Sequence, residues 1–383
     1  MSRIGRAIRV AALSVGAVGA TGLAVLARST EWFASLGARA TGERLERMRR
    51  SPQWSAGAQR FVNAMPTHTM LPRDAARSLR LQVAGGETRY PVRPIPVEAR
   101  RRSDFERPPA SGLRATWLGH ATALVEVDGA RILTDPVWSE RVSPSTLVGP
   151  RRFFEPPIAL ADLPRVDAVV ISHDHYDHLD METVKTLART GARFCVPLGV
   201  GAHLERWGMP ASQIDERDWG ETREIAGVTI TATPARHFSG RRLSDRDATL
   251  WCSWVIAGLR HRVFYSGDSG YFDGYRDIGR DHGPFDLTLM SLGAYGPTWP
   301  LIHMTPEEIV QAQRDLRGEL LLPIHWATFN LAFHAWNEPA LRMAADAHAK
   351  GVRFTIPRPG QMVEPDRLAV AGDGSETAAW WKE

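Results

Sequence analysis

The segment SHDHYDHLD, residues 172–180, constrains this 383-residue chain more than any other stretch. His173, His175, Asp177 and His178 place four metal-binding side chains within six residues. An apolar run, VDAVVI, precedes the segment and a helical pattern, METVKTLART, follows it. The cluster is therefore expected where a buried strand ends and a helix is about to begin. A polar loop without function is the alternative, but the density of ligating side chains favours a metal site.

Other polar residues recur where apolar, β-rich runs end. They are His120, Asp135, His173, His237, Asp268 and His325. Strand ends at one edge of a sheet converge in space, and rigid strands hold loop residues in fixed positions. A single histidine at a strand end is more often structural than a ligand. The repeated placement predicts that several of these residues share one site.

The number of candidate ligands indicates two ions. One tetrahedral ion with an open position needs three protein ligands. The cluster of four, together with the distant candidates, supplies seven, too many for one zinc ion and suited to two ions roughly 3.5–4 Å apart. In the predicted division Asp268 bridges the pair, one ion is held by His173, His175 and His237, and the other by Asp177, His178 and His325.

Residues 110–383 predict a layered α/β domain, because short apolar runs alternate with helical patterns. Asp128 and Gly129 separate two β-rich runs and indicate a two-residue hairpin turn. Thr305 and Glu308 are predicted to form a capping box at the start of a helix. Strands are expected within 166–172, 193–198, 227–235, 261–268, 285–293 and 318–326, and helices within 181–190, 201–208 and 305–318.

The N-terminal part of the chain is basic and differs from the body. Residues 1–110 contain 19 Lys and Arg against 8 Asp and Glu, whereas the remainder contains 28 against 35. Residues 1–28 are predicted to be a membrane anchor or a cleavable signal segment, since three arginines precede 18 uncharged residues. A soluble helix is the third alternative. Residues 29–109, the N-terminal extension, are interpreted either as a solvated basic linker or as a segment lying on a membrane surface, with Trp32, Phe33, Trp54 and Phe61 as interfacial anchors.

With these residues assembled, the chain resembles the metallo-β-lactamase-fold hydrolases. Within them it is similar to the N-acyl-phosphatidylethanolamine-hydrolysing phospholipase D family and its bacterial relatives. The motifs that carry the resemblance lie between residues 116 and 328 and include WLGHAT, SPSTLVGPRRF, SHDHYDHLD, SGDSGY, GAYGPTW and IHWATF. The resemblance implies an αββα sandwich of the α/β class, with the metals at one edge between two sheets.

The resemblance also implies an activity and a set of site residues. It implies two Zn²⁺ ions on the same seven ligands, and a dimetal-activated hydroxide that hydrolyses an N-acyl-phosphatidylethanolamine-like phospholipid to phosphatidic acid and N-acylethanolamine. His303 matches a histidine that the family places near the substrate, although a structural role beside a helix is the alternative. Asp177, Asp268 and His303 are therefore the candidate catalytic residues. Candidate substrate-binding residues are Tyr295, Trp299, His303, Trp326 and Phe329, and core packing is the alternative for the four other than His303. True β-lactamases have a cysteine where Asp268 stands, which disfavours antibiotic hydrolysis.

Two other functions stay open at this point. The same site could act on a lactone or on a small soluble phosphoester, because a fold does not fix a substrate. A non-catalytic, membrane-tethered zinc protein is the other alternative. The expected partners are a phospholipid or another anionic small molecule and a membrane surface that meets the basic N-terminal region, with no nucleic acid and with a homodimer left open. The chain is expected to be membrane-associated, on the cytoplasmic face or after export.

Overall fold

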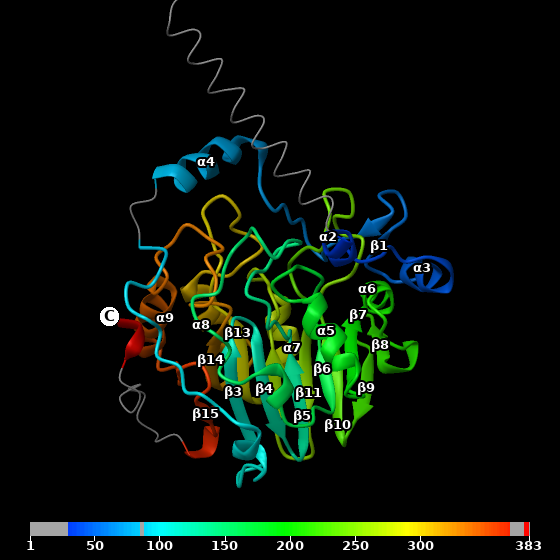
Figure 1. The fold of residues 1–383 in the computed structure, drawn as a ribbon. Helices are drawn as coiled ribbons and strands as arrows, with labels where there is room; N and C mark the ends of the chain where they lie inside the picture. The colour runs from blue at the N-terminus through cyan, green and yellow to red at the C-terminus, as the bar shows by residue number, and fades with distance from the viewer. Residues whose placement is uncertain (1–29, 85–87, 368–378, 383) are drawn as a thin grey trace, which may run out of the picture.

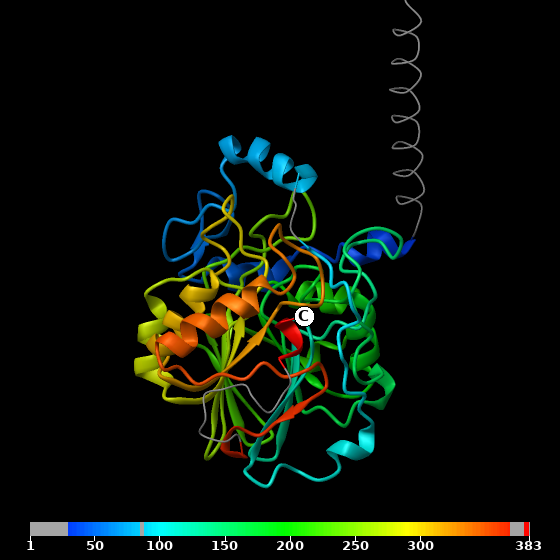
Figure 2. The ribbon, with the colours of Figure 1, turned by 90° about the vertical axis from the view of Figure 1, so that its left-hand side faces the viewer.

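The computed structural model describes residues 30–84, 88–367 and 379–382, so the predicted anchor or signal segment lies outside the described residues. Two large β-sheets pack face to face, and helices cover the outer face of each (Figures 1 and 2). This four-layer arrangement confirms the predicted αββα sandwich. The layers matter for function because they bring the ends of strands from both sheets to one edge.

The first sheet has seven strands in the order β15-β3-β4-β5-β6-β7-β8. Strands β3 to β5 are antiparallel neighbours, and β5 to β8 run parallel to one another. The bounds are β3 Leu113–Gly119, β4 Thr122–Val127, β5 Ala130–Thr134, β6 Ala168–Val170, β7 Arg193–Pro197, β8 Ile214–Arg217 and β15 Met362–Val363.

The predicted hairpin is confirmed between β4 and β5. Val127 pairs with Ala130 across a loop that contains only Asp128 and Gly129. Both loop residues have positive φ angles, 46° and 94°, as a type I′ turn requires. Asn, Asp and Gly tolerate this backbone region best, which explains why this dipeptide stands at the turn.

The second sheet has six strands in the order β14-β13-β12-β11-β10-β9. Strands β12, β13 and β14 are parallel, whereas β9 to β12 alternate in direction. The bounds are β9 Thr222–Ile225, β10 Val228–Thr233, β11 Ser253–Ala257, β12 Arg262–Tyr265, β13 Phe285–Ser291 and β14 Gly318–Ile324.

Helices cover the two outer faces. Helices α5 Met181–Ala188 and α6 Gly201–Arg206 flank the first sheet, and α7 Gly274–His282, α8 Pro306–Asp315 and α9 Glu338–Ala349 flank the second. The capping box predicted for α8 is present: Thr305 Oγ1 accepts from Glu308 N at 3.3 Å, and Glu308 Oε2 accepts from Thr305 N at 2.8 Å. Short 3-10 turns occur at 72–74, 102–105, 160–162, 211–213, 365–367 and 380–382.

The strands of the first sheet are buried on both faces, and their side chains alternate between two cores. Trp117 and Val125 belong to the core that lies between the sheets and continues through the second sheet to α7, α8 and α9. Leu118 and Leu124 point to the opposite face and pack with residues of α5 and α6. Alternate residues of a strand face opposite sides of its sheet, so one run of apolar residues serves both cores.

Described residues of the N-terminal extension pack against the sandwich. This part of the chain contains α2 Thr30–Ser35, α3 Gly42–Arg49, the two-stranded sheet of β1 Trp54–Ser55 and β2 Arg60–Phe61, and α4 Ala75–Ala84. Arg44 of α3 donates to Glu205 and Glu216, at 2.8 and 2.7 Å. The ring of Phe61 is 1% exposed and packs with Met48, Leu198, Leu250 and Trp251, so the suggestion that Phe61 is a surface anchor is wrong.

Helix α4 projects from the sandwich (Figures 1 and 2). A hydrogen bond of 2.9 Å from Ser78 Oγ to Thr298 Oγ1 joins it to the loop that follows β13. Within the described ranges, none of the helices has both the length and the apolar character needed to cross a membrane.

Candidate metal centre

The direction of the strands explains why the candidate ligands meet. In the first sheet, strands β3, β5 and β6 point in one common direction. In the second sheet, strands β10, β12 and β14 likewise point in a common direction. The six polar residues noted at strand ends each follow one of these six strands, at its carboxyl end. The structure brings together all seven predicted ligands at this shared edge.

The first group contains three histidines, His173, His175 and His237, whose ring nitrogens lie within 4.8 Å of one another. The Nε2 atom of His173 is 2.8 Å from Nδ1 of His175. His237 is fully buried, and its Nδ1 donates to the carbonyl oxygen of Ile302 at 2.9 Å. Its Nε2 faces the group and has no hydrogen-bond partner among the described residues. A buried imidazole nitrogen left in this way is costly unless it binds something else.

The second group contains Asp177, His178 and His325, with His120 as a fourth member. The Nε2 atoms of His178 and His325 lie 3.1 Å apart. Asp177 Oδ2 is 3.0 Å from His120 Nε2, 3.4 Å from His325 Nε2 and 3.5 Å from His178 Nε2. One carboxylate oxygen thus faces three imidazoles.

Asp268 lies between the two groups. Its Oδ2 is 3.1 Å from His178 Nε2 and 3.2 Å from His325 Nε2, and 3.9 Å from His237 Nε2 in the first group. Its other oxygen accepts from Ser291 Oγ at 2.9 Å, which fixes the plane of the carboxylate. This position suits the bridging role that the sequence predicts for Asp268, a role that stays a prediction.

Asp135 orients a member of the second group, His178, through a hydrogen bond to the ring nitrogen that faces away from Asp268. This fully buried carboxylate accepts from Ser172 N at 2.7 Å and from His178 Nδ1 at 2.6 Å, and it also accepts from Ser172 Oγ and Tyr265 OH. The bond to Nδ1 leaves Nε2 of His178 free to face Asp268. Carboxylate–histidine pairs of this kind orient the ligands of metal sites.

Opposing effects set the protonation of the buried site. Burial lowers the pKa of His178, but Asp268, Asp177 and Asp135 outweigh it and hold that pKa well above its ordinary value. Burial also lowers the pKa of His325, but Asp268 and Asp177 outweigh this effect, so that the pKa is raised above its ordinary value. Burial dominates at His173 and His237, where it lowers the pKa.

The residues present fit a pair of cations. Imidazole nitrogens and carboxylate oxygens from both sheets face one another, and the buried His237 Nε2 has no hydrogen-bond partner among the described residues. Nitrogen and oxygen donors of this type suit zinc among several divalent metals. His173, His175 and His237 would hold one cation, Asp177, His178 and His325 the other, with Asp268 shared.

Metal binding is expected to release protons at neutral pH. In the metal-free protein the raised pKa values of His178 and His325 keep protons on imidazoles that must be neutral to ligate. Apparent affinity should therefore rise with pH until both groups have lost their protons, and fall as the pH is lowered. Calorimetric titration with Zn²⁺ in two buffers of different ionisation enthalpy measures the effect. Binding heats independent of the buffer would contradict it.

His303 lies beside the first group. Its Nδ1 is buried without a hydrogen-bond partner among the described residues, 3.9 Å from Asp268 Oδ2, and its ring centroid is 5.1 Å from that of His237. Burial lowers the pKa of His303 to about 4, although Asp268 opposes this shift. The imidazole is therefore neutral at pH 7, when it can donate one hydrogen bond and accept another.

The four predicted aromatic substrate residues take different positions. Phe329 contacts the His120 ring at 5.1 Å between centroids. Trp326 stacks between Trp117 and Trp380, as a core aromatic does, and together with Phe329 and His325 it also borders a small cavity. The other two lie in a different loop, between β13 and α8: Tyr295 donates to Glu338 at 2.8 Å, and Trp299 donates to the carbonyl oxygen of Ala294 at 2.7 Å.

Two residues of the centre fell outside the predicted ligand set. His120 and Asp135 were recognisable as polar residues at strand ends, but their sequence spacing gave no sign that one faces Asp177 and the other His178. His120 has a φ of 50°, a backbone conformation that few non-glycine residues adopt. Its carbonyl oxygen accepts from His325 N at 2.7 Å, so this bent segment joins the two sheets at the metal centre.

The fold and the site together define a class, the metal-dependent hydrolases of the metallo-β-lactamase fold. A family model described as the beta-lactamase superfamily domain matches residues 130–326. An uncharacterized protein of Mycobacterium tuberculosis is 47% identical over 366 residues, 94% of this chain and 96% of that protein. The N-acyl-phosphatidylethanolamine-hydrolyzing phospholipase D 1 of Caenorhabditis elegans is 39% identical over 247 residues, 61% of this chain and 69% of the enzyme.

Among solved structures, a metallo hydrolase of the archaeon Ignicoccus hospitalis is 26% identical, with a TM-score of 0.51, and the match covers 66% of this chain and 97% of that one. The chain belongs to the beta-lactamase superfamily, and the resemblance found in its motifs is confirmed. Family and site together make it a metal-dependent hydrolase.

Proposed function

We propose that the protein is a zinc-dependent phosphodiesterase of phospholipase D type that acts on N-acyl-phosphatidylethanolamine-like phospholipids. The observation that carries the proposal is the 39% identity to a nematode enzyme of that activity, in a chain whose site gathers two groups of ligands around Asp268. In the reaction, a water oxygen bonds to phosphorus and the bond from phosphorus to the ethanolamine oxygen breaks. Phosphatidic acid and N-acylethanolamine are the products.

The side chains divide the work of this reaction. Two bound cations would make a water acidic enough to attack at neutral pH and would neutralise charge that develops on the phosphoryl oxygens. Asp177 and Asp268 offer carboxylate oxygens that can accept a hydrogen bond from the attacking water and orient it. Neutral His303 can donate a hydrogen bond from its N–H to the ethanolamine oxygen, and the proton that this oxygen gains comes from the attacking water.

The apolar residues near the centre would take the acyl chains. Phe329 and Trp326 lie beside His325, and Trp299 contacts Phe333 with ring centroids 5.2 Å apart. Tyr295 would complete this wall. Such apolar surface beside a polar reacting centre suits a lipid with a phosphodiester headgroup.

We further propose that the protein works at a membrane surface. Phe33 of α2, Leu79 of α4 and Leu243 of the loop that carries His237 are exposed apolar side chains, and α4 adds Arg77 and Arg80. Basic residues near exposed apolar ones favour an anionic lipid surface. We expect no nucleic-acid partner, and a homodimer is compatible with this arrangement.

The test is a substrate panel with the purified protein loaded with zinc. Vesicles containing N-acyl-phosphatidylethanolamine should yield N-acylethanolamine, detected by mass spectrometry, and a chelator should abolish the product until zinc is restored. A water-soluble phosphodiester and a water-soluble lactone serve as competing substrates. His175→Ala should lose this activity, and exchange of the exposed His348 for alanine is its matched control. Turnover of the lactone, with none of the lipid, would refute the proposed substrate.

A further inference from the structure

A segment of the N-terminal extension lies along the loop that carries His237. We call residues 62–69, which follow β2, the strap. The loop spans residues 234–252, between β10 and β11. At its start, Arg236 donates to Thr67 Oγ1 and to the carbonyl oxygen of Pro66, both at 3.1 Å. Further along, Arg246 donates to Thr69 Oγ1 at 2.8 Å. The strap therefore contacts the loop on both sides of the candidate ligand.

Asn63 of the strap holds the backbone of His237 at two points. Its Nδ2 donates to the carbonyl oxygen of His237 at 2.7 Å, and its Oδ1 accepts from His237 N at 3.1 Å. With the bond from His237 Nδ1 to the carbonyl oxygen of Ile302, three hydrogen bonds fix this residue. The remaining nitrogen, Nε2, faces the other ligands of the first group.

His237 depends on these contacts because it lies in irregular backbone. Neither a helix nor a strand includes the residues around it, so no regular backbone ladder fixes its position. A metal site needs its ligands within about 0.5 Å of the productive geometry. Loss of a group that orients a ligand typically costs 10- to 100-fold in metal affinity. Asn63 is such an orienting group for His237, because it bonds both the N–H and the carbonyl oxygen of that residue.

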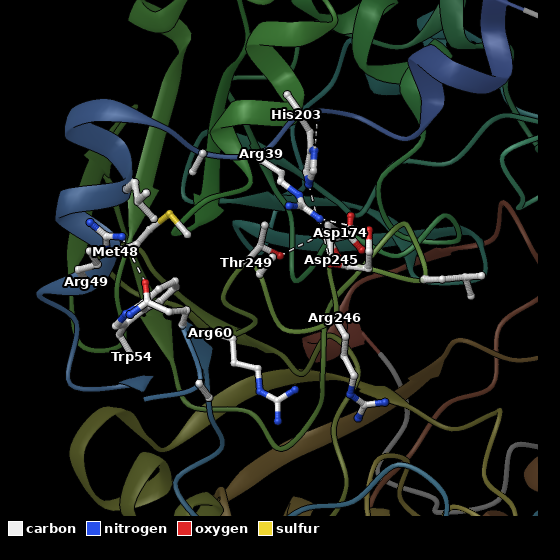
Figure 3. Close-up of a pocket in the computed structure, with 18 residues that line it drawn as sticks. Arg39, Met48, Arg49, Trp54, Arg60, Asp174, His203, Asp245, Arg246 and Thr249 are labelled. Carbon is white, nitrogen blue, oxygen red and sulfur yellow. Dashed lines mark hydrogen bonds and ion pairs between the residues drawn. The ribbon is translucent and has the colours of Figure 1, made fainter. Parts of the chain in front are cut away.

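A second contact reaches the other ligand segment of the first group. Ala38 N donates to His203 Nδ1 at 3.0 Å, so His203 carries its proton on Nε2 and donates to Asp174 Oδ2 at 3.2 Å. Asp174 stands between His173 and His175 in the sequence and also accepts from Thr249 at 2.9 Å. Figure 3 shows His203 and Thr249 pointing toward Asp174. All three residues line a cavity of about 600 Å³.

We propose that the N-terminal extension is a working part of the metal centre and that Asn63 is a positioning residue for His237. The family match begins only at residue 130, so this role belongs to a part of the chain outside it. The inference rests on His237 as a metal ligand and is independent of the substrate.

The experiment is a Co²⁺ titration of the metal-free full-length protein, followed by visible absorption. Asn63→Ala should weaken binding of one of the two cations by about 10- to 100-fold and leave the other unchanged. Asn63→Asp, which keeps the acceptor for His237 N and loses the donor, should give an intermediate loss. Thr69→Ala removes a strap hydrogen bond to Arg246 that does not involve His237, and should bind both cations as the wild type does.

Thermal unfolding of the metal-free variants shows that each is folded and measures general loosening separately. Wild-type affinity for both cations in Asn63→Ala would overturn the proposal. So would equal losses in Asn63→Ala and Thr69→Ala, or binding of fewer than two cations by the wild type. Because no substrate is used, these results are distinct from failure of the lipid assay.

Discussion

Exchange of Asp268 for alanine is expected to lower kcat/KM at least about a thousandfold, which corresponds to about 4 kcal/mol of transition-state stabilisation. Asp268 faces both ligand groups, with Oδ2 3.1 Å from His178 Nε2 and 3.9 Å from His237 Nε2. Its loss removes a donor from each cation site and leaves the imidazolium-forming His178 and His325 without their main counter-charge. Steady-state kinetics together with metal analysis measure both effects.

Asp273→Ala is the matched control, because this carboxylate is largely exposed and lies before α7, outside the candidate site. It should retain full activity and metal content. Asp268→Asn separates charge from shape, since the amide keeps the volume and loses the charge. An Asp268→Ala protein that hydrolyses its substrate at a rate near that of the wild type would show that this residue is no part of the catalytic centre.

Exchange of Asp135 for alanine is expected to lower the free energy of unfolding by about 3–5 kcal/mol. The carboxylate is fully buried and accepts from Ser172, His178 and Tyr265. Removing it leaves several buried donors unpaired, and each such group costs about 1–3 kcal/mol. His178 also loses the bond that orients it, so metal affinity should fall as well. Urea unfolding of metal-free and zinc-loaded protein gives the two contributions separately.

Asp167→Ala provides the comparison. This carboxylate lies just before β6, the parallel neighbour of the strand β5 that Asp135 follows, and it accepts from Arg131 N at 2.9 Å. Its removal should cost roughly 1 kcal/mol, the usual value for one hydrogen bond, without a change in metal affinity. If Asp135→Ala and Asp167→Ala lost the same free energy of unfolding, the hydrogen bonds of Asp135 would contribute no more to stability than a single ordinary hydrogen bond.

Much of the fold was predictable because local signals agree with the final structure. The Asp128–Gly129 turn and the Thr305 capping box act within a few residues, and both are present where the sequence predicts them. Helix α7 went unpredicted, and its two glycines explain why, since glycine is a poor helix former. The reason for Gly279 is tertiary: a Cβ there would lie 2.2 Å from the carbonyl oxygen of Asp315. Close packing of α7 on α8 requires a residue that local propensity disfavours.

In the site, too, some features follow from local sequence signals and others only from tertiary contacts. The seven candidate ligands could be found because each follows a strand or belongs to the dense 173–178 cluster, and strand ends converge by geometry. The supporting residues could not be found in this way. Asn63 is an unremarkable residue between β2 and α4, and only the folded chain reveals that it meets His237, 174 positions away. Positions fixed by tertiary contact leave no periodic signal in a sequence.

Anomalous diffraction would show whether side chains from both sheets hold two cations around Asp268. Crystals of the full chain loaded with zinc would be measured at the zinc absorption edge. We expect two peaks, one among His173, His175 and His237 and one among Asp177, His178 and His325. A single peak, or peaks away from these residues, would contradict it.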